Sequence, residues 1–460
     1  MKTIDIYFSY KENVFFFKII SRGRLFMKLK KLALCTVSML TVFALGACSK
    51  DDTNKKSSGK TEISMLIGKE EIANELDEAI SKYNDSQDKY QVKVIPLAGQ
   101  NSTEKITSLY ASKNAPVLMN TGVYTELEQW KDKFLDLSDM ELVTHIDKKY
   151  LEAGTVDGKV IGIPTTIEAF GFLYNQEVLD KASGGKFNPS SVKTRQDLKT
   201  LMANIEKQTE KSAVEISPMD WSLGAHYSNL LFTDQSENKD QRYAFMDQMM
   251  NGKENLMNND VYNNWIDTFD LMKKNNMSQS SPLSSDYDAA TMALANGEIG
   301  LWFMGNWAYP QLKEANPETK YGILPVPISD KVNAYGNDQI SVGVPQTWAI
   351  DGEQSSKEEQ DGAKDFINWL YETEEGQEYY VNKMGFIPIN DNAKVEPNDE
   401  LSKQILNYVK EDKTLEWMNA QYPPTAFPAM GASLQKYLSG EIDRKELAQE
   451  LEDYWKTSAK

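Results

Sequence analysis

The sequence predicts an α/β protein with two domains, each built around a sheet. The chain has 460 residues, of which 40% are hydrophobic, and single hydrophobic cores stop growing at roughly 250–300 residues. Strand-like and helix-like segments alternate from residue 61 to the C-terminus. This alternation predicts mostly parallel sheets flanked by helices, with ligand sites in crevices at the carboxyl ends of the strands.

The first predicted unit is strand, helix, strand. Residues 61–67, TEISMLI, alternate between polar and apolar and predict a strand. Residues 70–86 have apolar side chains at helical spacing, and residues 90–97, YQVKVIPL, predict a second strand. A βαβ unit of this length favours parallel pairing of its strands. Residues 103–122 repeat the pattern of a helix followed by a buried strand.

The rest of the chain continues the alternation. Strands are predicted within residues 159–175, 213–217, 299–304, 321–328 and 340–350. Helices are predicted within residues 176–182, 192–208, 225–280, 289–296, 307–315 and 358–384, followed by a loop at 385–390 and a helical remainder.

The N-terminus has the layout of an export signal. Lys28, Lys30 and Lys31 precede an apolar run that begins at Leu32 and ends at Cys48, and this run is shorter than the about 20 residues a membrane span needs. Residues 45–48, LGAC, resemble a bacterial lipobox. The resemblance implies a palmitate-bearing diacylglycerol on Cys48; a secretory signal with a chance cysteine is the alternative.

This interpretation divides the first 60 residues into three parts. We expect residues 1–26 to be a non-native upstream extension without a fold, because Met27 followed by a lysine is a better start for such a signal. Residues 27–47 are then a lipoprotein signal peptide. Residues 48–60 are the lipidated cysteine and a flexible tether, whose polar composition predicts disorder.

Composition excludes several kinds of partner and chemistry. The chain has a net charge of −18, and from Cys48 onward 42 basic residues face 66 acidic ones. Such a surface repels phosphate backbones and anionic lipid headgroups, so we expect no nucleic acid partner. The only cysteines are Cys35 and Cys48 and the only histidines are His145 and His226. We therefore expect no metal, no cofactor and no enzyme that depends on these residues.

Four segments together carry a resemblance to a known family. They are IPTTIEAFGFLYN (163–175), GEIGLWFMGNWAYPQL (297–312), YGILPVP (321–327) and AKDFINWLYETEEGQEYYVNKMGFIPI (363–389). In this order they resemble the sugar-binding branch of the bacterial extracellular solute-binding proteins, the group that includes maltose-binding protein. The resemblance spans roughly residues 61–455. It implies a monomeric, lipid-anchored protein on the outer face of the cell membrane that hands an oligosaccharide to the permease of an ABC importer.

The resemblance also implies a fold of two lobes with a ligand cleft between them. Strands would cross between the lobes near residues 163–166, 326–341 and 385–388. Lobe one would comprise residues 61–165 plus 340–387, and lobe two would comprise residues 166–337 plus 388–460.

A sugar site needs hydrogen-bonding side chains for the hydroxyl groups and flat aromatic rings for the apolar faces. Trp307 follows a strand-like segment and a Gly-Asn turn, as the family's aromatic platform does. Glu168 follows the first crossing, where the family often places a sugar-binding acid, and an acid among apolar residues is costly unless it is paired. Asp220 and Trp221 lie where relatives carry loop acids and aromatics.

The ends of predicted strands supply further candidates. Lys69, Asn120 and Thr121 end two strands, where a cleft is expected. Tyr124, Asn306 and Trp417 are additional candidates. In the C-terminal region, where relatives often carry an aromatic, this chain has PPTAFPAM (423–430), so Trp417 or Tyr422 would have to replace it. A second departure from the family's pattern is Pro116-Val117 in place of a Pro-Asp pair.

Two other functions remain open at this stage. The same fold could bind a non-sugar solute such as a polyamine or a peptide, because acids and aromatics are both available. A surface-anchored glycosidase would need two carboxylates at a defined separation. With 66 acidic residues in the mature chain, some close pair is inevitable, and the sequence singles out none.

Overall fold

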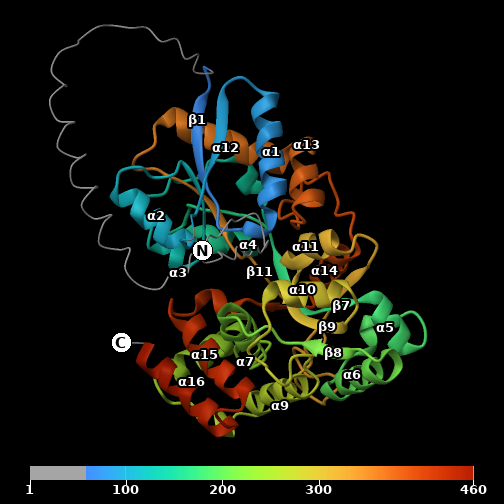
Figure 1. The fold of residues 1–460 in the computed structure, drawn as a ribbon. Coiled ribbons are helices and arrows are strands. Elements are labelled where there is room, and N and C mark those ends of the chain that lie inside the picture. Colours follow the sequence, from blue (N-terminus) through green and yellow to red (C-terminus); the bar gives the residue numbers. More distant parts are fainter. Residues whose placement is uncertain (1–58, 99, 459–460) are drawn as a thin grey trace, which may run out of the picture. The chain divides into compact units, whose positions relative to one another are not determined.

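The computed structural model describes residues 59–98 and 100–458 (Figure 1). The predicted upstream extension, signal peptide, Cys48 and nearly all of the tether lie outside these residues. Within the described part of the chain, the longest helix has 16 residues, and none combines the length and apolar character that crossing a bilayer requires.

The first sheet has five strands in the order β2-β1-β3-β12-β6. Their bounds are β1 (Thr61–Leu66), β2 (Tyr90–Ile95), β3 (Leu118–Thr121), β6 (Ile163–Pro164) and β12 (Thr347–Ile350). β1 pairs in parallel with β2, with Thr61 opposite Tyr90, and also in parallel with β3. Helix α1 (Ala73–Ser86) connects β1 and β2, so the predicted parallel βαβ unit is confirmed.

The second sheet has six strands in the order β13-β11-β7-β9-β8, with β10 also paired to β7. Their bounds are β7 (Glu168–Asn175), β8 (Ser212–Glu215), β9 (Ile299–Gly305), β10 (Tyr321–Leu324), β11 (Ile340–Gly343) and β13 (Thr414–Glu416). A small hairpin of β4 (Thr155–Val156) and β5 (Lys159–Val160) is separate. The predicted α/β fold with two sheets is confirmed.

Strand directions are more mixed than the alternation of helices and strands predicts. β12 runs antiparallel to β3 and β6, while β9, β10 and β11 all run antiparallel to β7. β12 enters the first sheet directly from the second, without the intervening helix that reverses the chain between parallel strands.

Two details of the C-terminal half differ from the prediction. The single strand predicted at 340–350 is divided into β11 and β12, which belong to different sheets. Pro345 lies at the division and has no N–H for a sheet ladder. β13 was predicted to be helical; it is only three residues long and pairs with β11, which no local pattern indicates.

Helices cover both sheets, and Figure 1 shows α1 and α12 beside β1. Gly362 of α12 lies directly against Ile63 of β1 and Tyr90 of β2. The α helices not yet delimited are α2 (Ser102–Ala111), α3 (Thr125–Glu128), α4 (Lys148–Leu151), α5 (Gln176–Ser183), α6 (Arg195–Thr209), α7 (Ser228–Thr233), α8 (Lys239–Met250), α9 (Asp260–Lys274), α10 (Tyr287–Ala295), α11 (Tyr309–Ala315), α12 (Lys357–Glu372), α13 (Glu374–Gln377), α14 (Glu400–Lys410), α15 (Ala426–Ser439) and α16 (Arg444–Ser458).

Short segments that join the two sheets lie side by side. Only residues 165–167 separate β6 from β7, and only residues 344–346 separate β11 from β12. The Thr165 N–H and Oγ1 both donate to the carbonyl oxygen of Gln346 at 2.9 Å. Thr166 Oγ1 accepts a hydrogen bond from the backbone N–H of Ile387 at 2.9 Å. These bonds hold the junction between the sheets together.

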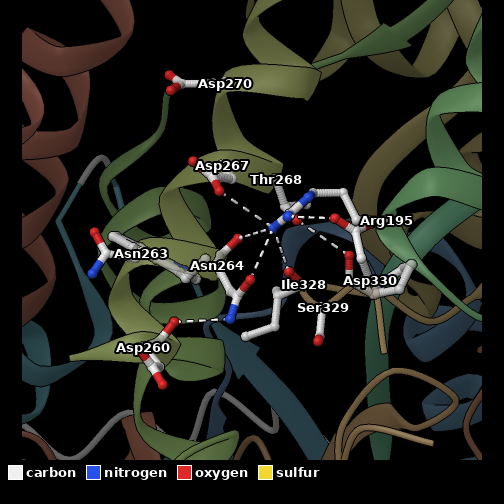
Figure 2. A network of polar contacts seen from close by, with 12 residues as sticks. Arg195, Asp260, Asn263, Asn264, Asp267, Thr268, Asp270, Ile328, Ser329 and Asp330 are labelled. Atoms are coloured by element: carbon white, nitrogen blue, oxygen red, sulfur yellow. Dashed lines mark hydrogen bonds and ion pairs between the residues drawn. The ribbon is translucent and has the colours of Figure 1, made fainter. Parts of the chain in front are cut away.

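A polar network fixes the chain where it leaves β10 (Figure 2). Arg195, the first residue of α6, donates from Nη1 to the Ile328 carbonyl oxygen at 2.8 Å and to Asn264 Oδ1 at 3.2 Å. Its Nη2 donates to Asp330 Oδ2 at 2.7 Å. The planar guanidinium can satisfy several acceptors at once, which an ammonium group cannot.

Replacing Arg195 with methionine should lower the free energy of unfolding by about 2–3 kcal/mol, because hydrogen bonds to charged groups are lost and their acceptors are left unpaired. Urea denaturation of the purified protein measures this. The matched control is Arg444→Met, since Arg444 is 36% exposed and its ion pairs with Asp267 and Asp270 should contribute about 1 kcal/mol or less. Equal losses of unfolding free energy in the two variants would show that the Arg195 network stabilises the fold no more than the exposed ion pairs of Arg444.

Candidate ligand-binding site

A cavity of about 1020 Å³, the first cavity, opens at the junction of the two sheets. The loop after β1, the start of α2 and the residues after β3 form one side of it. The start of β7, the segment before α7 and the start of α10 form another. Trp307 and Gln311 after β9, the residues between β11 and β12, and those from the end of β13 to the start of α15 complete the wall. This position matches the expectation that ligands bind beyond strand ends.

Four aromatic side chains gather on one wall of the first cavity. The ring centroid of Trp307 lies 6.0 Å from that of Trp221, 5.0 Å from that of His226 and 6.4 Å from that of Trp417. His226 also stacks on the buried ring of Phe170 at 4.5 Å. Such a cluster offers flat apolar surface to a ligand.

Local backbone structure explains how these rings come together. Trp221–Tyr227 form a π-helical turn, whose wider hydrogen-bond spacing brings residues five apart, Trp221 and His226, onto one face. Trp307 folds back over Gly305 at the end of β9. A Cβ at Gly305 would lie 2.0 Å from the indole ring, so only glycine permits this placement.

The charged centre of the first cavity is Lys69. Its Nζ donates to Glu168 Oε1 at 2.7 Å and to Glu71 Oε1 at 2.9 Å, and it lies over the ring of Phe386. Burial lowers the pKa of Lys69, but the two carboxylates outweigh this effect and hold that pKa above its usual value. Lys69 is therefore charged, and it joins the loop after β1 to the first residue of β7.

Several buried polar atoms around the first cavity have no hydrogen-bond partner among the described residues. They are Tyr287 Oη, Gln311 Oε1, Gln346 Oε1, Trp417 Nε1 and Asn419 Oδ1. Buried polar groups are normally hydrogen-bonded, and an unpaired one is costly. Five residues that line one cavity thus each hold a buried polar atom that has no partner among the described residues.

Of the residues chosen from the sequence, six line the first cavity: Lys69, Glu168, Trp221, Trp307, Trp417 and its alternative Tyr422. The others lie elsewhere. Asp220 accepts a hydrogen bond from Gln435, Asn306 accepts one from the Ala169 N–H, and Asn120 and Thr121 are buried between strands and bond to Thr347. Tyr124 lies on a second cavity.

Sequence reasoning missed His226, Tyr287, Gln346, Asn419 and Phe427, all of which line the first cavity. His226 sits in a polar segment predicted only as helix-rich, and π-helical spacing leaves no sequence signal. In the C-terminal region, Trp417, Tyr422 and Phe427 all lie on the cavity wall, so the PPTAFPAM segment contributes its own aromatic ring.

Comparison with known proteins defines the family. Residues 78–408 match the model of the bacterial extracellular solute-binding protein family. The chain belongs to this family. It is 22% identical over 309 residues to a multiple sugar-binding protein of Streptococcus mutans, an alignment that covers 65% of this chain and 70% of the relative.

Solved structures share the fold. The binding protein RafE in complex with raffinose has a TM-score of 0.72 at 19% identity and covers 87% of this chain and all of its own. A sugar transporter protein of Bacillus licheniformis in complex with stachyose has a TM-score of 0.66 at 19% identity, covering 86% of this chain and all of its own. At these identities the likeness establishes the fold of this family member.

His226 should make stability depend on pH. Burial lowers the pKa of His226 to about 3, whereas an unfolded histidine has a pKa of about 6.5. Between pH 6.5 and 3, His226 is therefore protonated in the unfolded state and neutral in the folded state. The free energy of unfolding consequently falls as the pH drops from 6.5 toward 3.

Between pH 7.5 and 5, the wild type should lose about 1–2 kcal/mol more unfolding free energy than His226→Phe, since the side chain keeps some exposure to the cavity. Urea denaturation of both proteins at the two pH values measures the difference. Every other titrating group is the same in the two proteins, so its contribution to the pH dependence cancels in the comparison. Identical pH dependence in the two proteins would contradict a buried neutral imidazole.

Proposed function

We propose that this protein is the substrate-binding component of a carbohydrate ABC importer, which captures an oligosaccharide and delivers it to the membrane permease without a catalytic step. The observation that carries the proposal is the cluster of Trp221, His226, Trp307 and Trp417 on a cavity that amide and carboxylate side chains also line. Rings cover sugar faces, and amides and carboxylates bind hydroxyl groups. The names of several relatives also refer to sugars.

Capture would work through closure of two lobes. Our proposed lobes comprise residues 61–165 plus 340–387 and residues 166–337 plus 388–460, joined by the hydrogen-bonded crossing segments. A ligand that contacts both lobes only in the closed form binds that form more tightly and shifts the population toward it. The permease would then recognise the closed form.

A thermal-shift screen tests the substrate class. The purified protein is heated with raffinose, stachyose, malto-oligosaccharides, spermidine and short peptides in turn. A ligand at one hundred times its dissociation constant should stabilise the folded state by about 2.7 kcal/mol. A rise in the unfolding temperature with one related set of sugars supports the proposal. No rise with any sugar, together with a rise with another solute, contradicts it.

A polyamine is the second candidate because of the charge of the first cavity. Its lining includes five acidic residues and, among the residues the structure describes, a single basic one, Lys69. The acids are Glu70, Glu71, Glu126, Glu168 and Asp288. Glu168 and Glu71 already pair with Lys69, which leaves fewer carboxylates for a cation and favours the sugar. Spermidine in the screen decides between them.

We also propose that Cys48 anchors the protein to the outer face of the cell membrane through a diacylglycerol. The test is expression of the full chain in a Gram-positive host supplied with a clickable palmitate analogue. Cys48→Ala should lose the label and appear in the medium, while the matched control Cys35→Ala should keep the label and stay with the cells. Label retained in Cys48→Ala would contradict this anchor.

A further inference from the structure

A second cavity, of about 750 Å³, lies next to the first one. Val344, Trp417 and Ala420 line both cavities, so they adjoin along this shared wall. Tyr124, which the sequence analysis chose as a ligand contact, lines the second cavity and not the first.

Trp417 is the main element of the shared wall. Its indole packs on Gly343 of β11, where a Cβ would lie 2.4 Å from the ring, so the ring lies close against the strand. The side chain is only 7% exposed, and no hydrogen-bond partner of Nε1 exists among the described residues. Trp417 therefore places an aromatic ring in the wall that the two cavities share, where the face of a sugar could pack.

Aromatic and charged side chains line the second cavity. Tyr124, Tyr150 and Tyr335 line it, and within the described residues no hydrogen bond is made by their hydroxyl groups. Arg242, 6% exposed, also lines it; the guanidinium donates to Glu416 at 2.6 Å, and Nε has no partner in the part of the chain that the structure describes. Rings with free hydroxyl groups beside charged hydrogen-bonding groups are suited to a sugar.

The backbone of Tyr124 adds an independent observation. Its φ of 47° and ψ of −109° lie outside the regions that non-glycine residues favour. Strained residues of this kind persist where surrounding structure holds them and concentrate at ligand clamps. Tyr124 follows the end of β3, and Glu416 of β13 lines the same cavity, so Tyr124 contributes the first sheet's side of the second cavity.

We propose that the second cavity binds the terminal unit of a neutral oligosaccharide longer than a disaccharide, whose other units occupy the first cavity, with Trp417 between the two positions. This inference rests on the proposed function. It narrows the substrate to trisaccharides and longer sugars, which are long enough to reach past the Trp417 indole.

Calorimetric titration against two length series tests the inference. The first series is sucrose, raffinose and stachyose, which lengthens by one galactose unit at a time, and the second runs from maltose to maltohexaose. The proteins are the wild type, Tyr335→Ala and Tyr124→Phe in the second cavity, and Trp307→Ala in the first. Tyr379→Ala is the matched control, because Tyr379 is half-buried and lines neither cavity.

We expect wild-type affinity to rise with length in one series. Tyr335→Ala should weaken the longest bound sugar about tenfold and leave the shortest bound sugar within about twofold of wild type. Tyr124→Phe should also weaken the longest sugar more than the shortest one, with a smaller loss of affinity. This variant keeps the test valid if Tyr335→Ala does not fold. Trp307→Ala should weaken every length, and Tyr379→Ala none.

If the second-cavity variants lost the same affinity for sugars of every length, or lost none, the inference would be overturned. The sugar-binding function would remain intact in either case. A second sugar molecule bound per chain would also overturn it, because the cavities would then act independently. If the wild type bound no sugar of any length while it bound spermidine, the proposed function itself would fail.

Discussion

Trp307→Ala should weaken binding of the cognate oligosaccharide at least about 30-fold, equivalent to about 2 kcal/mol, as expected for a central aromatic residue of a binding site. Its ring lies within 6.4 Å of Trp221, His226 and Trp417, so its removal opens the middle of the aromatic wall. Calorimetric titration with the sugar found in the thermal-shift screen measures the loss.

Trp369→Ala is the matched control for this prediction. Trp369 is a half-buried tryptophan on α12 that packs against Tyr83 and Phe366 and lines neither cavity. Its removal should lower stability without changing the dissociation constant. An unchanged affinity in Trp307→Ala, with the protein folded, would show that the aromatic wall does not hold the ligand.

Lys69→Met should lower the free energy of unfolding by about 3–5 kcal/mol, because breaking a buried ion pair leaves an uncompensated buried charge. Lys69 and Glu168 are each 7% exposed, and 2.7 Å separates the Lys69 Nζ from Glu168 Oε1. Urea denaturation at pH 7.5 measures the change. The same variant should also lose affinity, since Lys69 lines the first cavity.

A double-mutant cycle isolates the pair. Glu168→Gln alone removes the charge that Lys69 balances, although Glu71 remains at 2.9 Å and is 21% exposed. The double variant Lys69→Met with Glu168→Gln removes both charges, so its loss should be clearly smaller than the sum of the single losses. Additive losses would contradict a coupled ion pair at this junction.

Local sequence patterns were sufficient to predict the helices and strands whose apolar residues recur regularly over many positions. The βαβ unit at the start of the body follows from alternation in β1 and helical spacing in α1, and both were predicted within a few residues. The place of Trp307 on the first cavity was predictable because the strand, the glycine and the tryptophan are adjacent in the sequence. The resemblance to the family rests on segments of the same local kind.

Other features depend on contacts that are distant in the sequence. β13 exists because β11 offers an edge 74 residues away, and its three residues carry no strand pattern of their own. His226 reaches the site through a π-helical turn, and Asn306 and Asn120 turn inward because Ala169 and Thr347 offer partners there. Strand ends predict where polar residues lie, and tertiary contacts decide which of them face the cavity.

A crystal structure of the protein with the sugar that stabilises it most shows directly whether the first cavity binds an oligosaccharide. We expect electron density for a sugar in the first cavity, with one ring face against Trp307 or Trp221 and hydroxyl groups bonded to Gln346 or Asn419. A sugar bound at any other place, with the first cavity still without ligand, would show that the first cavity is not the binding site.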